Sequence, residues 1–383
     1  MSSDKAGHKL EGPRSGRPDE LEAILETANA VIRVARGLPP TVITDYPHLY
    51  NTDNVDNIII VKDGDRVAST VAIWTNTIEI GAARLQVGGI NILATLPEYR
   101  RGGLGTAVME ASHQRMRDLG CHVGRLTTDI TNWYRRLGWE NAGIVCTYKF
   151  DRANMTLLPR LPAGVTLRCV PSPLDDATIE IVLQSHHADR LGGIRTPALM
   201  RTFLGAPGDP KVMTFPQAIL AESDGQAAAY LLERDQEIIE WGGPGELVAG
   251  LLRAWFEAND DAQASTSERD NNFKSVSNDR VSLVAPMYGH SLSQILQPFS
   301  LPRSVEYWGM LHVFDPRGIL DAFGLQDISV EEENGRFTLE RRDARVTVDR
   351  RQLAKLLFGP ERIADFASDV LPLQFWEWPL EHV

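Results

Sequence analysis

The sequence contains few cysteines, and this scarcity excludes two kinds of site. Only three cysteines occur in 383 residues, Cys121, Cys146 and Cys169, and they are scattered along the chain. A disulfide framework needs more cysteines, and a zinc site needs them at closer spacing. A reducing cytoplasm is therefore the expected location.

Long apolar segments are also missing. No run approaches the ~20 apolar residues that a membrane-spanning helix needs. Residues 1–17 are polar and lack the apolar core of a secretory signal. We therefore expect no membrane span, and a disordered tail over residues 1–17.

Basic residues are outnumbered by acidic ones, 39 against 51, which gives a formal net charge of −12. This charge argues against a nucleic-acid partner, because phosphates need a basic surface. It is compatible with a cationic small molecule or peptide, which an acidic field attracts. The length predicts two or three globular domains.

The order of the predicted elements in the first 150 residues indicates an α/β fold with a mixed sheet. Apolar spacing predicts the helices, and alternating residues bounded by turn signals predict the strands. The expected elements are a helix at 18–35, strands at 57–61 and 66–74, a pair of strands within 84–95, a helix after residue 105, and strands at 123–126 and 144–150.

The remainder of the chain divides into two further segments, after a proline-containing boundary at 151–162. The same patterns predict strands and helices in both. They are strands at 218–222 and 227–233, a helix at 246–256, an acidic surface loop at 257–272, a helix at 316–323, a hairpin within 328–348 and a helix at 350–358.

The most informative stretch covers residues 93–106, which read Leu-Ala-Thr-Leu-Pro-Glu-Tyr-Arg-Arg-Gly-Gly-Leu-Gly-Thr. Its glycines permit a tight turn between a strand and a helix. The free amides at the helix start, with Arg100 and Arg101 beside them, favour an anion. The stretch therefore predicts a phosphate or pyrophosphate site, although a lone glycine turn is often only a turn. It lacks the Gly-Lys-Ser/Thr of a P-loop.

Two motifs resemble those of the GCN5-related N-acetyltransferases (GNAT). Arg100, Gly103 and Gly105 match the Arg-x-x-Gly-x-Gly motif of this superfamily. Residues 132–139, Asn-Trp-Tyr-Arg-Arg-Leu-Gly-Trp, resemble its second signature, which is built around an aromatic residue, a tyrosine and a glycine. Core packing is the alternative explanation for Trp133, Tyr134 and Trp139.

The length and the order of elements resemble the Eis family (enhanced intracellular survival). This resemblance implies an α/β (α+β) fold with two tandem GNAT-like mixed-sheet domains, followed by a small sterol-carrier-like α+β domain. The implied boundaries are 18–155, 160–290 and 300–383. The middle segment reads Trp-Gly-Gly-Pro-Gly-Glu at 241–246, without the arginine. We therefore expect that it is degenerate and binds no coenzyme.

The same resemblance implies acetyl-coenzyme A as the donor, a primary amine as the acceptor, and no metal. The pantetheine arm would lie along the strand end at Leu93, whose amide could polarise the thioester carbonyl. The residues expected to bind the coenzyme are Leu93, Ala94, Thr95, Arg100, Arg101, Gly102, Gly103, Leu104, Gly105, Thr106 and Asn132.

Two proton transfers are needed, and the resemblance implies a residue for each. Tyr134 would be the general acid that protonates the leaving thiolate. The terminal carboxylate of Val383 would be the general base. Residues 371–383 are rich in aromatic and aliphatic side chains, so this segment should be buried. Glu377, Glu381 and His382 are the rival bases.

The acceptor site is expected near residues 45–50, with Asp53, Asp56 and Trp74 as further candidates for its wall. Carboxylates and aromatic rings together favour a cation. Aminoglycosides, polyamines, free amino compounds and lysine side chains all remain open as acceptors, and a longer acyl donor also remains open. The alternative function is a non-catalytic sensor that binds an acyl-coenzyme A or a lipid-like ligand. The resemblance also implies a homo-oligomer, and the Eis family suggests a hexamer.

Overall fold

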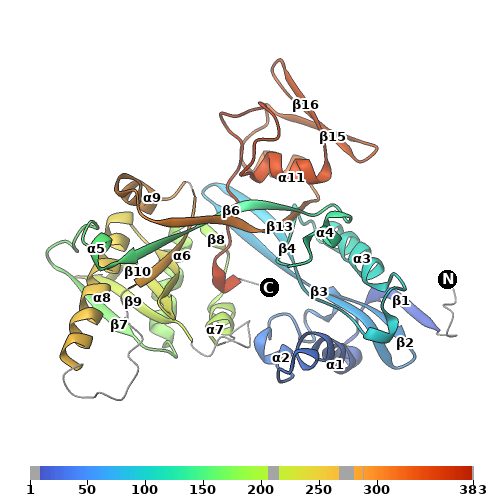
Figure 1. The fold of residues 1–383 in the computed structure, drawn as a ribbon, viewed down its shortest axis with the longest axis horizontal. Coiled ribbons are helices and arrows are strands. Elements are labelled where there is room, and N and C mark those ends of the chain that lie inside the picture. Colours follow the sequence, from blue (N-terminus) through green and yellow to red (C-terminus); the bar gives the residue numbers. More distant parts are fainter. Residues whose placement is uncertain (1–8, 206–214, 267–279, 288, 382–383) are drawn as a thin grey trace.

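The computed structural model describes residues 9–205, 215–266, 280–287 and 289–381. Within these residues, the strands form one 13-stranded mixed sheet and a separate three-stranded sheet. The large sheet has the order β1-β2-β3-β4-β5-β13-β6-β12-β11-β10-β9-β7, and β8 pairs with β3. Figure 1 shows this sheet running the width of the molecule, with the smaller sheet standing above its middle.

The first half of the chain supplies one end of the large sheet. Its strands are β1 (Leu10–Ser15), β2 (Ile58–Asp63), β3 (Arg66–Ile80), β4 (Ala83–Thr95), β5 (Val123–Leu126) and β6 (Glu140–Asp151). Its helices are α1 (Leu21–Ile32), α2 (Val42–Asp45), α3 (Leu104–Asp118), α4 (Thr131–Arg135) and α5 (Arg152–Met155), with a 3-10 turn at Pro97–Tyr99.

The second half supplies the other end and the smaller sheet. Its strands are β7 (Val165–Val170), β8 (Leu191–Gly193), β9 (Gln217–Ser223), β10 (Gln226–Arg234), β11 (Glu237–Gly242), β12 (Arg280–Pro286), β13 (Arg303–Val313), β14 (Ser329–Glu333), β15 (Arg336–Arg341) and β16 (Ala344–Asp349). Its helices are α6 (Asp176–Asp189), α7 (Pro197–Gly205), α8 (Gly245–Thr266), α9 (Ser291–Leu296), α10 (Pro316–Ala322) and α11 (Arg350–Phe358).

The side chains of β3 point alternately to the two faces of the sheet and pack into a different core on each face. Val71 and Ile73 pack with α3, through Val108 and Met109. Trp74 packs on the other face, in the cluster that contains α1 and α7. Successive residues of a strand point to opposite faces. The glycine turn that precedes α3 and the predicted acceptor wall near Trp74 therefore approach the sheet from opposite sides.

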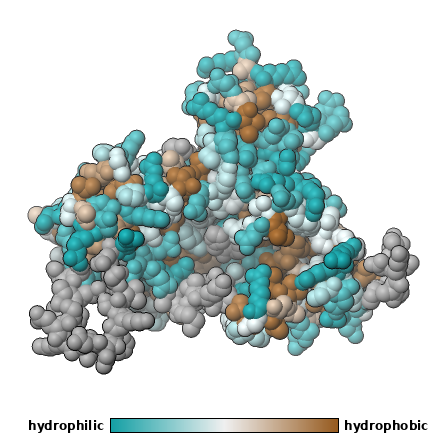
Figure 2. Space-filling model, viewed as in Figure 1, coloured by the Kyte–Doolittle hydropathy of each residue, from teal (hydrophilic) through white to brown (hydrophobic). Residues whose placement is uncertain are grey.

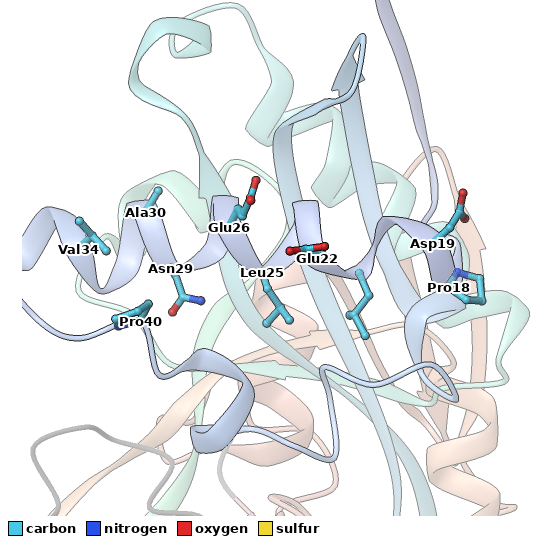
Figure 3. Close-up of a pocket in the computed structure, with 10 residues that line it drawn as sticks. Pro18, Asp19, Glu22, Leu25, Glu26, Asn29, Ala30, Val34 and Pro40 are labelled. Atoms are coloured by element: carbon cyan, nitrogen blue, oxygen red, sulfur yellow. The ribbon is translucent and has the colours of Figure 1, made fainter.

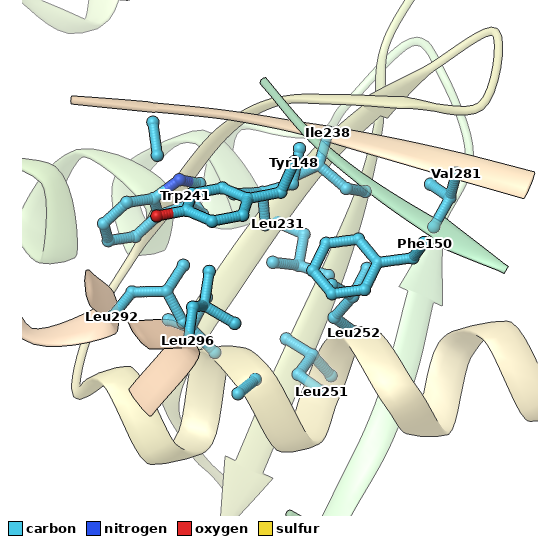
Figure 4. Packing of buried hydrophobic residues seen from close by; sticks show 14 of the residues in the cluster. Tyr148, Phe150, Leu231, Ile238, Trp241, Leu251, Leu252, Val281, Leu292 and Leu296 are labelled. Atoms are coloured by element: carbon cyan, nitrogen blue, oxygen red, sulfur yellow. The ribbon is translucent and has the colours of Figure 1, made fainter. Parts of the chain in front are cut away.

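Strand β6 belongs to both ends of the large sheet. It pairs with β13 on one side and with β12 on the other. Figure 4 shows its Tyr148 and Phe150 among side chains from α8, α9 and neighbouring strands, including Leu252 and Leu296. The two halves of the chain therefore share one continuous sheet and part of one core.

Strand β13 comes from the segment 300–383, for which the sequence predicts a third domain. It lies in the large sheet, between β5 and β6. The elements that stand apart begin later, with α10 and the three-stranded sheet. Pairing between strands so far apart in the sequence leaves no local signal.

Three expected segments differ from the structure. The expected tail over 1–17 is wrong at its end, because β1 pairs with β2 and Arg14 forms an ion pair with Glu20 at 2.7 Å. The expected strand pair within 84–95 is one strand, β4. The expected loop at 257–272 is helical as far as Thr266, because an acidic, polar composition is also compatible with a helix. Residues 267–272 lie outside the described residues.

Candidate active site

Strands β4 and β5 are parallel and separate within the sheet. They pair only where Val87–Gly89 meets Val123–Arg125. β4 then continues to Thr95, whereas β5 ends at Leu126. The end of β4 thus carries backbone groups past the last pairing with β5. The carboxyl ends of parallel strands are a common place for ligands.

A bulge redirects β4 beyond this point. Thr70 pairs with Ala94 and Ala72 pairs with Asn91, so Ile92 and Leu93 together face Val71. Ile92 has a positive φ of 39°. A bulge leaves the extra residue out of the ladder and turns its backbone groups. The amide of Leu93, expected from the sequence to meet the thioester, lies in this bulge.

The glycine turn before α3, which we call the cradle, leaves backbone amides without partners inside the helix. Arg101 and Gly103 both have left-handed backbones, with φ of 65° and 83°. The helix bond from the Ala107 amide to the Gly103 carbonyl measures 3.0 Å. The amides of Leu104 to Thr106 precede that first helix bond, and no side chain caps this start among the described residues. Together with the helix dipole, these amides favour negative charge.

A pocket of about 250 Å³ lies over this turn. Its lining residues are Thr95, Tyr99, Arg100, Arg101, Gly103, Leu104, Gly105, Thr106 and Trp133. A Cβ on Gly105 would lie 3.7 Å from Thr95 Oγ1 and 3.8 Å from Trp133. Glycine thus keeps the floor of the pocket open.

Two arginines, Arg100 and Arg101, lie beside this turn. Both side chains are exposed, and neither forms an ion pair within the described residues. Arg100 Nε donates to the Thr95 carbonyl at 3.0 Å, which ties the arginine to the strand end. Guanidinium groups beside free amides suit phosphate oxygens. Of the other expected residues, Ala94 is buried, while Gly102 and Asn132 are exposed and do not line the pocket.

Tyr134 lies on α4 with only 7% of its surface exposed. Its ring meets Trp133 edge-on at 4.8 Å and Trp139 at 6.5 Å between centroids. Burial raises the pKa of the Tyr134 phenol to about 12. The hydroxyl therefore stays protonated at neutral pH and is available as a donor.

An aromatic cluster lies on the opposite face of the sheet, and the rings of His48, Trp74 and Phe203 form it. The centroid of His48 is 5.3 Å from Trp74 and 5.3 Å from Phe203. Burial lowers the pKa of His48 to about 4, so this imidazole is neutral. Phe203 comes from α7, in the second half of the chain, and the sequence carried no signal for its presence here.

The acidic residues suggested for the acceptor wall are differently placed. Asp45 is buried and accepts from Arg33 Nη2 at 2.8 Å, so its charge is already balanced. Asp53 and Asp56 are exposed on the turns that precede β2. Of the residues predicted for the acceptor wall, Trp74 and His48 are therefore in contact with each other, whereas Asp45 is paired with Arg33.

The rival bases near the end of the chain are also in ion pairs. Glu377 is 2% exposed and Glu381 is fully buried. Glu377 pairs with Arg125 at 3.1 Å, and Glu381 pairs with Arg195 at 2.8 Å. His382 and Val383 lie outside the described residues.

The glycine turn of the second half, before α8, is filled by the chain itself. The Gly243 amide donates to Asp189 Oδ2 at 2.7 Å. The carboxylate of Asp189 thus occupies the position that a ligand phosphate would take. A Cβ on Gly245 would lie 2.6 Å from the Ser291 backbone. This helix start differs from that of α3, which opens into a pocket.

Other pockets lie away from these residues. One, of about 660 Å³, runs along α1 and is lined by residues such as Leu25, Glu22 and Pro40 (Figure 3). Another, at Leu356 and Phe366 in the C-terminal part of the chain, has a volume of only about 10 Å³.

Within the described residues, no helix is long and apolar enough to span a membrane, and no three His, Cys, Asp or Glu side chains form a metal-binding group.

Comparison with known families identifies the domain that carries the cradle. Residues 13–142 match the model of the acetyltransferase (GNAT) domain. These residues include the bulge, the glycine turn and Tyr134. The first part of the chain belongs to the GNAT family, and the protein is an acyltransferase. The family predicted from the two motifs is confirmed.

Solved structures with the same fold cover nearly the whole chain. A conserved protein of unknown function from Enterococcus faecalis V583 has a TM-score of 0.62 at 13% identity, over 91% of this chain and 89% of that one. A GCN5-related N-acetyltransferase from Kribbella flavida gives 0.56 at 18%, over 89% and 86%. Eis1 from Mycobacterium abscessus gives 0.59 at 14%, over 89% and 85%. No curated protein sequence matches significantly. The predicted mixed α/β GNAT fold is confirmed, while the sterol-carrier-like assignment stays a prediction.

Proposed function

We propose that the protein transfers an acetyl group from acetyl-coenzyme A to a primary amine on a cationic small molecule or peptide. The observation that carries this proposal is the open helix start at α3 with Arg100 and Arg101 beside it. It adjoins the bulged end of β4, as the coenzyme of this family requires. The net charge of −12 favours a cationic acceptor.

The chain's own residues divide the work. The coenzyme supplies an activated acyl thioester when it is bound. Arg100, Arg101 and the amides of residues 103–106 hold its pyrophosphate. The Leu93 amide, in the bulge, donates to the thioester carbonyl. These contacts position the reacting groups, which can account for ~7–11 kcal/mol of the barrier.

Proton transfer is assigned to two groups. Tyr134 donates a hydrogen bond to the leaving sulfur. With a pKa of about 12 the phenol is a weaker acid than a free tyrosine, so stabilising the thiolate is a larger part of its role than full transfer. The carboxylate of Val383 remains the proposed base, on the family resemblance alone. The domain boundaries, a cytoplasmic location and a homo-oligomeric state also remain proposals.

A screen for thiol release tests this function. The full-length protein is given acetyl-coenzyme A and a panel of polyamines, aminoglycosides, amino acids and lysine peptides, and free thiol is measured. We expect turnover with at least one cationic amine, and slower release with longer acyl donors. Coenzyme binding without turnover on any amine would instead support the sensor. The pocket of about 10 Å³ in the C-terminal part of the chain gives no support to a lipid-like ligand there.

A further inference from the structure

The segment at 371–381 lies between the two halves of the chain and is almost completely buried. Trp376 stacks on Trp308 of β13, with centroids 5.3 Å apart. Trp378 meets Trp241 of β11 edge-on at 5.4 Å. Figure 1 shows the red end of the chain entering the middle of the molecule, beneath β6 and β13. The segment therefore contacts strands on both sides of the centre of the large sheet.

One buried arginine holds this segment at the point where β4 and β5 part. Arg125 pairs with Gly89 in the last β4–β5 contact, and its side chain is fully buried. Its Nε lies 3.1 Å from Glu377 Oε2. Its guanidinium also lies over the Trp308 ring, 5.7 Å from the centroid. The first half thus binds the segment where the pairing of β4 with β5 ends.

A second buried arginine holds the segment from the other half. Arg195 Nε donates to Glu381 Oε1 at 2.8 Å, and its Nη1 donates to both oxygens of Glu240 on β11, at 2.9 and 3.0 Å. The amides of Gly193 and Trp378 also donate to Glu381, at 2.7 and 2.8 Å. Both oxygens of Glu381 are therefore hydrogen-bonded.

The position of Glu381 relates this contact to the acceptor face. A Cβ on Gly193 would collide with both Glu381 and Asn76 of β3, so these two side chains meet around the glycine. Asn76 is two residues after Trp74 and therefore points to the same face of the sheet. The segment thus ends beside the strand that carries the aromatic cluster.

Both carboxylates are buried in ion pairs. Buried ion pairs often add little net stability, although removing one partner leaves an uncompensated charge. Two such pairs on one segment, only four residues apart, fix its position in a way that apolar contacts alone do not. We therefore attribute to these ion pairs the positioning of the segment rather than a gain in the free energy of unfolding.

We propose that Arg125 and Arg195 are positioning residues that hold the 371–381 segment on the acceptor face, where it completes the acceptor site. This inference rests on the proposed acetyl transfer. It also gives the second half of the chain, whose own glycine turn is filled, a role in the reaction of the first half.

Arg195→Gln tests the proposal, with Arg195→Lys as the conservative variant. We expect hydrogen exchange in 371–381 to rise roughly tenfold or more in the glutamine variant, because the segment opens locally. The kcat for the acceptor should fall by about tenfold, whereas the Kd for coenzyme A should stay within roughly twofold. The lysine variant should recover part of the kcat. The matched control is Arg201→Gln on nearby α7, which removes an exposed ion pair with Asp176 of α6. It should change neither the exchange in 371–381 nor the kcat.

Glu381→Gln gives a second route if Arg195→Gln does not fold, since it keeps the side-chain shape and removes the charge. Unchanged exchange in 371–381 and unchanged kcat would overturn the proposal. So would increased exchange across the whole sheet together with lost coenzyme binding, because that pattern indicates general destabilisation. If the wild type turns over no amine, the proposed function fails. The role of the arginines is then decided by hydrogen exchange alone: increased exchange that is confined to 371–381, with coenzyme binding retained, shows that they hold the segment.

Discussion

At the scale of single residues, Tyr134 combines a phenol with a nearly water-free environment. Replacing it with phenylalanine keeps the ring contacts with Trp133 and Trp139 and removes only the hydroxyl. We expect kcat to fall by roughly 10²–10⁴-fold. The affinity for coenzyme A should be unchanged, as measured by calorimetry. A variant with wild-type kcat would show that Tyr134 serves only the core.

His113 makes the stability of the first half depend on pH. Trp139 Nε1 donates to His113 Nε2 at 2.9 Å, which requires an unprotonated nitrogen. Burial, with help from the nearby charges of Arg117 and Arg350, lowers the pKa of His113 to about 4, below the ordinary 6.5. The unfolded chain therefore binds the proton more readily, and stability is lost as the pH falls from 6.5 towards 4.

This effect can be measured against a variant. Between about pH 7 and pH 5, His113 alone should reduce the free energy of unfolding by about 2 kcal/mol. His113→Gln retains an acceptor for Trp139 and does not titrate, so its melting temperature should change less over the same range. Glu377 acts in the opposite direction, because burial raises its pKa to about 7. Equal slopes for the variant and the wild type would refute the assignment.

At the scale of elements, the two glycine turns make opposite predictions. Gly105→Val places methyl groups in the α3 pocket, where a Cβ has only ordinary contacts. We expect the melting temperature to stay close to that of the wild type, while the Kd for coenzyme A rises by roughly tenfold or more. Calorimetry and thermal unfolding measure both quantities.

The contrasting variant is Gly245→Ala at the start of α8. Its Cβ would lie 2.6 Å from the Ser291 backbone, which is too close to be accommodated without movement. The melting temperature should fall, in line with the 1–3 kcal/mol cost of overpacking. If Gly245→Ala were harmless and Gly105→Val unfolded the protein, the account of the two turns would be reversed.

Elements with local signals were predictable from the sequence, and those that depend on distant partners were not. The helix expected at 350–358 is α11, whose start is capped by Asp349 accepting from the Gln352 amide at 2.8 Å. The glycine turn before α3 was predictable for the same reason. The place of β13 depends on pairing with β5 across nearly 200 residues, and Phe203 reaches the aromatic cluster only through the packing of α7.

The same distinction applies to charged residues. Asp45 appeared suitable for an acceptor because the sequence does not reveal its partner Arg33, which lies a helix away. Arg125 and Arg195 carried no motif, and only the fold brings them to Glu377 and Glu381. Burial and pairing, rather than residue type, decide which charges are available to a substrate.

At the scale of the whole molecule, both halves of the chain contribute strands to one large sheet. A fragment ending at residue 155 lacks β13, which pairs with both β5 and β6. It would expose the edges of these strands. We expect the fragment alone to show no cooperative thermal unfolding and no coenzyme binding.

Adding the fragment that starts at residue 156 supplies β13, and it should restore both properties at least in part. Cooperative unfolding of the first fragment by itself would contradict the role of β13.

The exposed large apolar side chains, such as Val34, Ile130 and Val305, lie on separate parts of the chain. Figure 2 shows brown regions as separate groups on a mostly teal face.

The most direct test of the central claim is a calorimetric comparison of coenzyme A with pantetheine, which lacks the pyrophosphate and the 3′-phosphoadenosine attached to it. If the α3 amides and the two arginines bind phosphate oxygens, coenzyme A should bind at least about 100-fold more tightly, and the difference should shrink in high salt. Equal affinities for the two compounds, or no binding of either, would contradict the account.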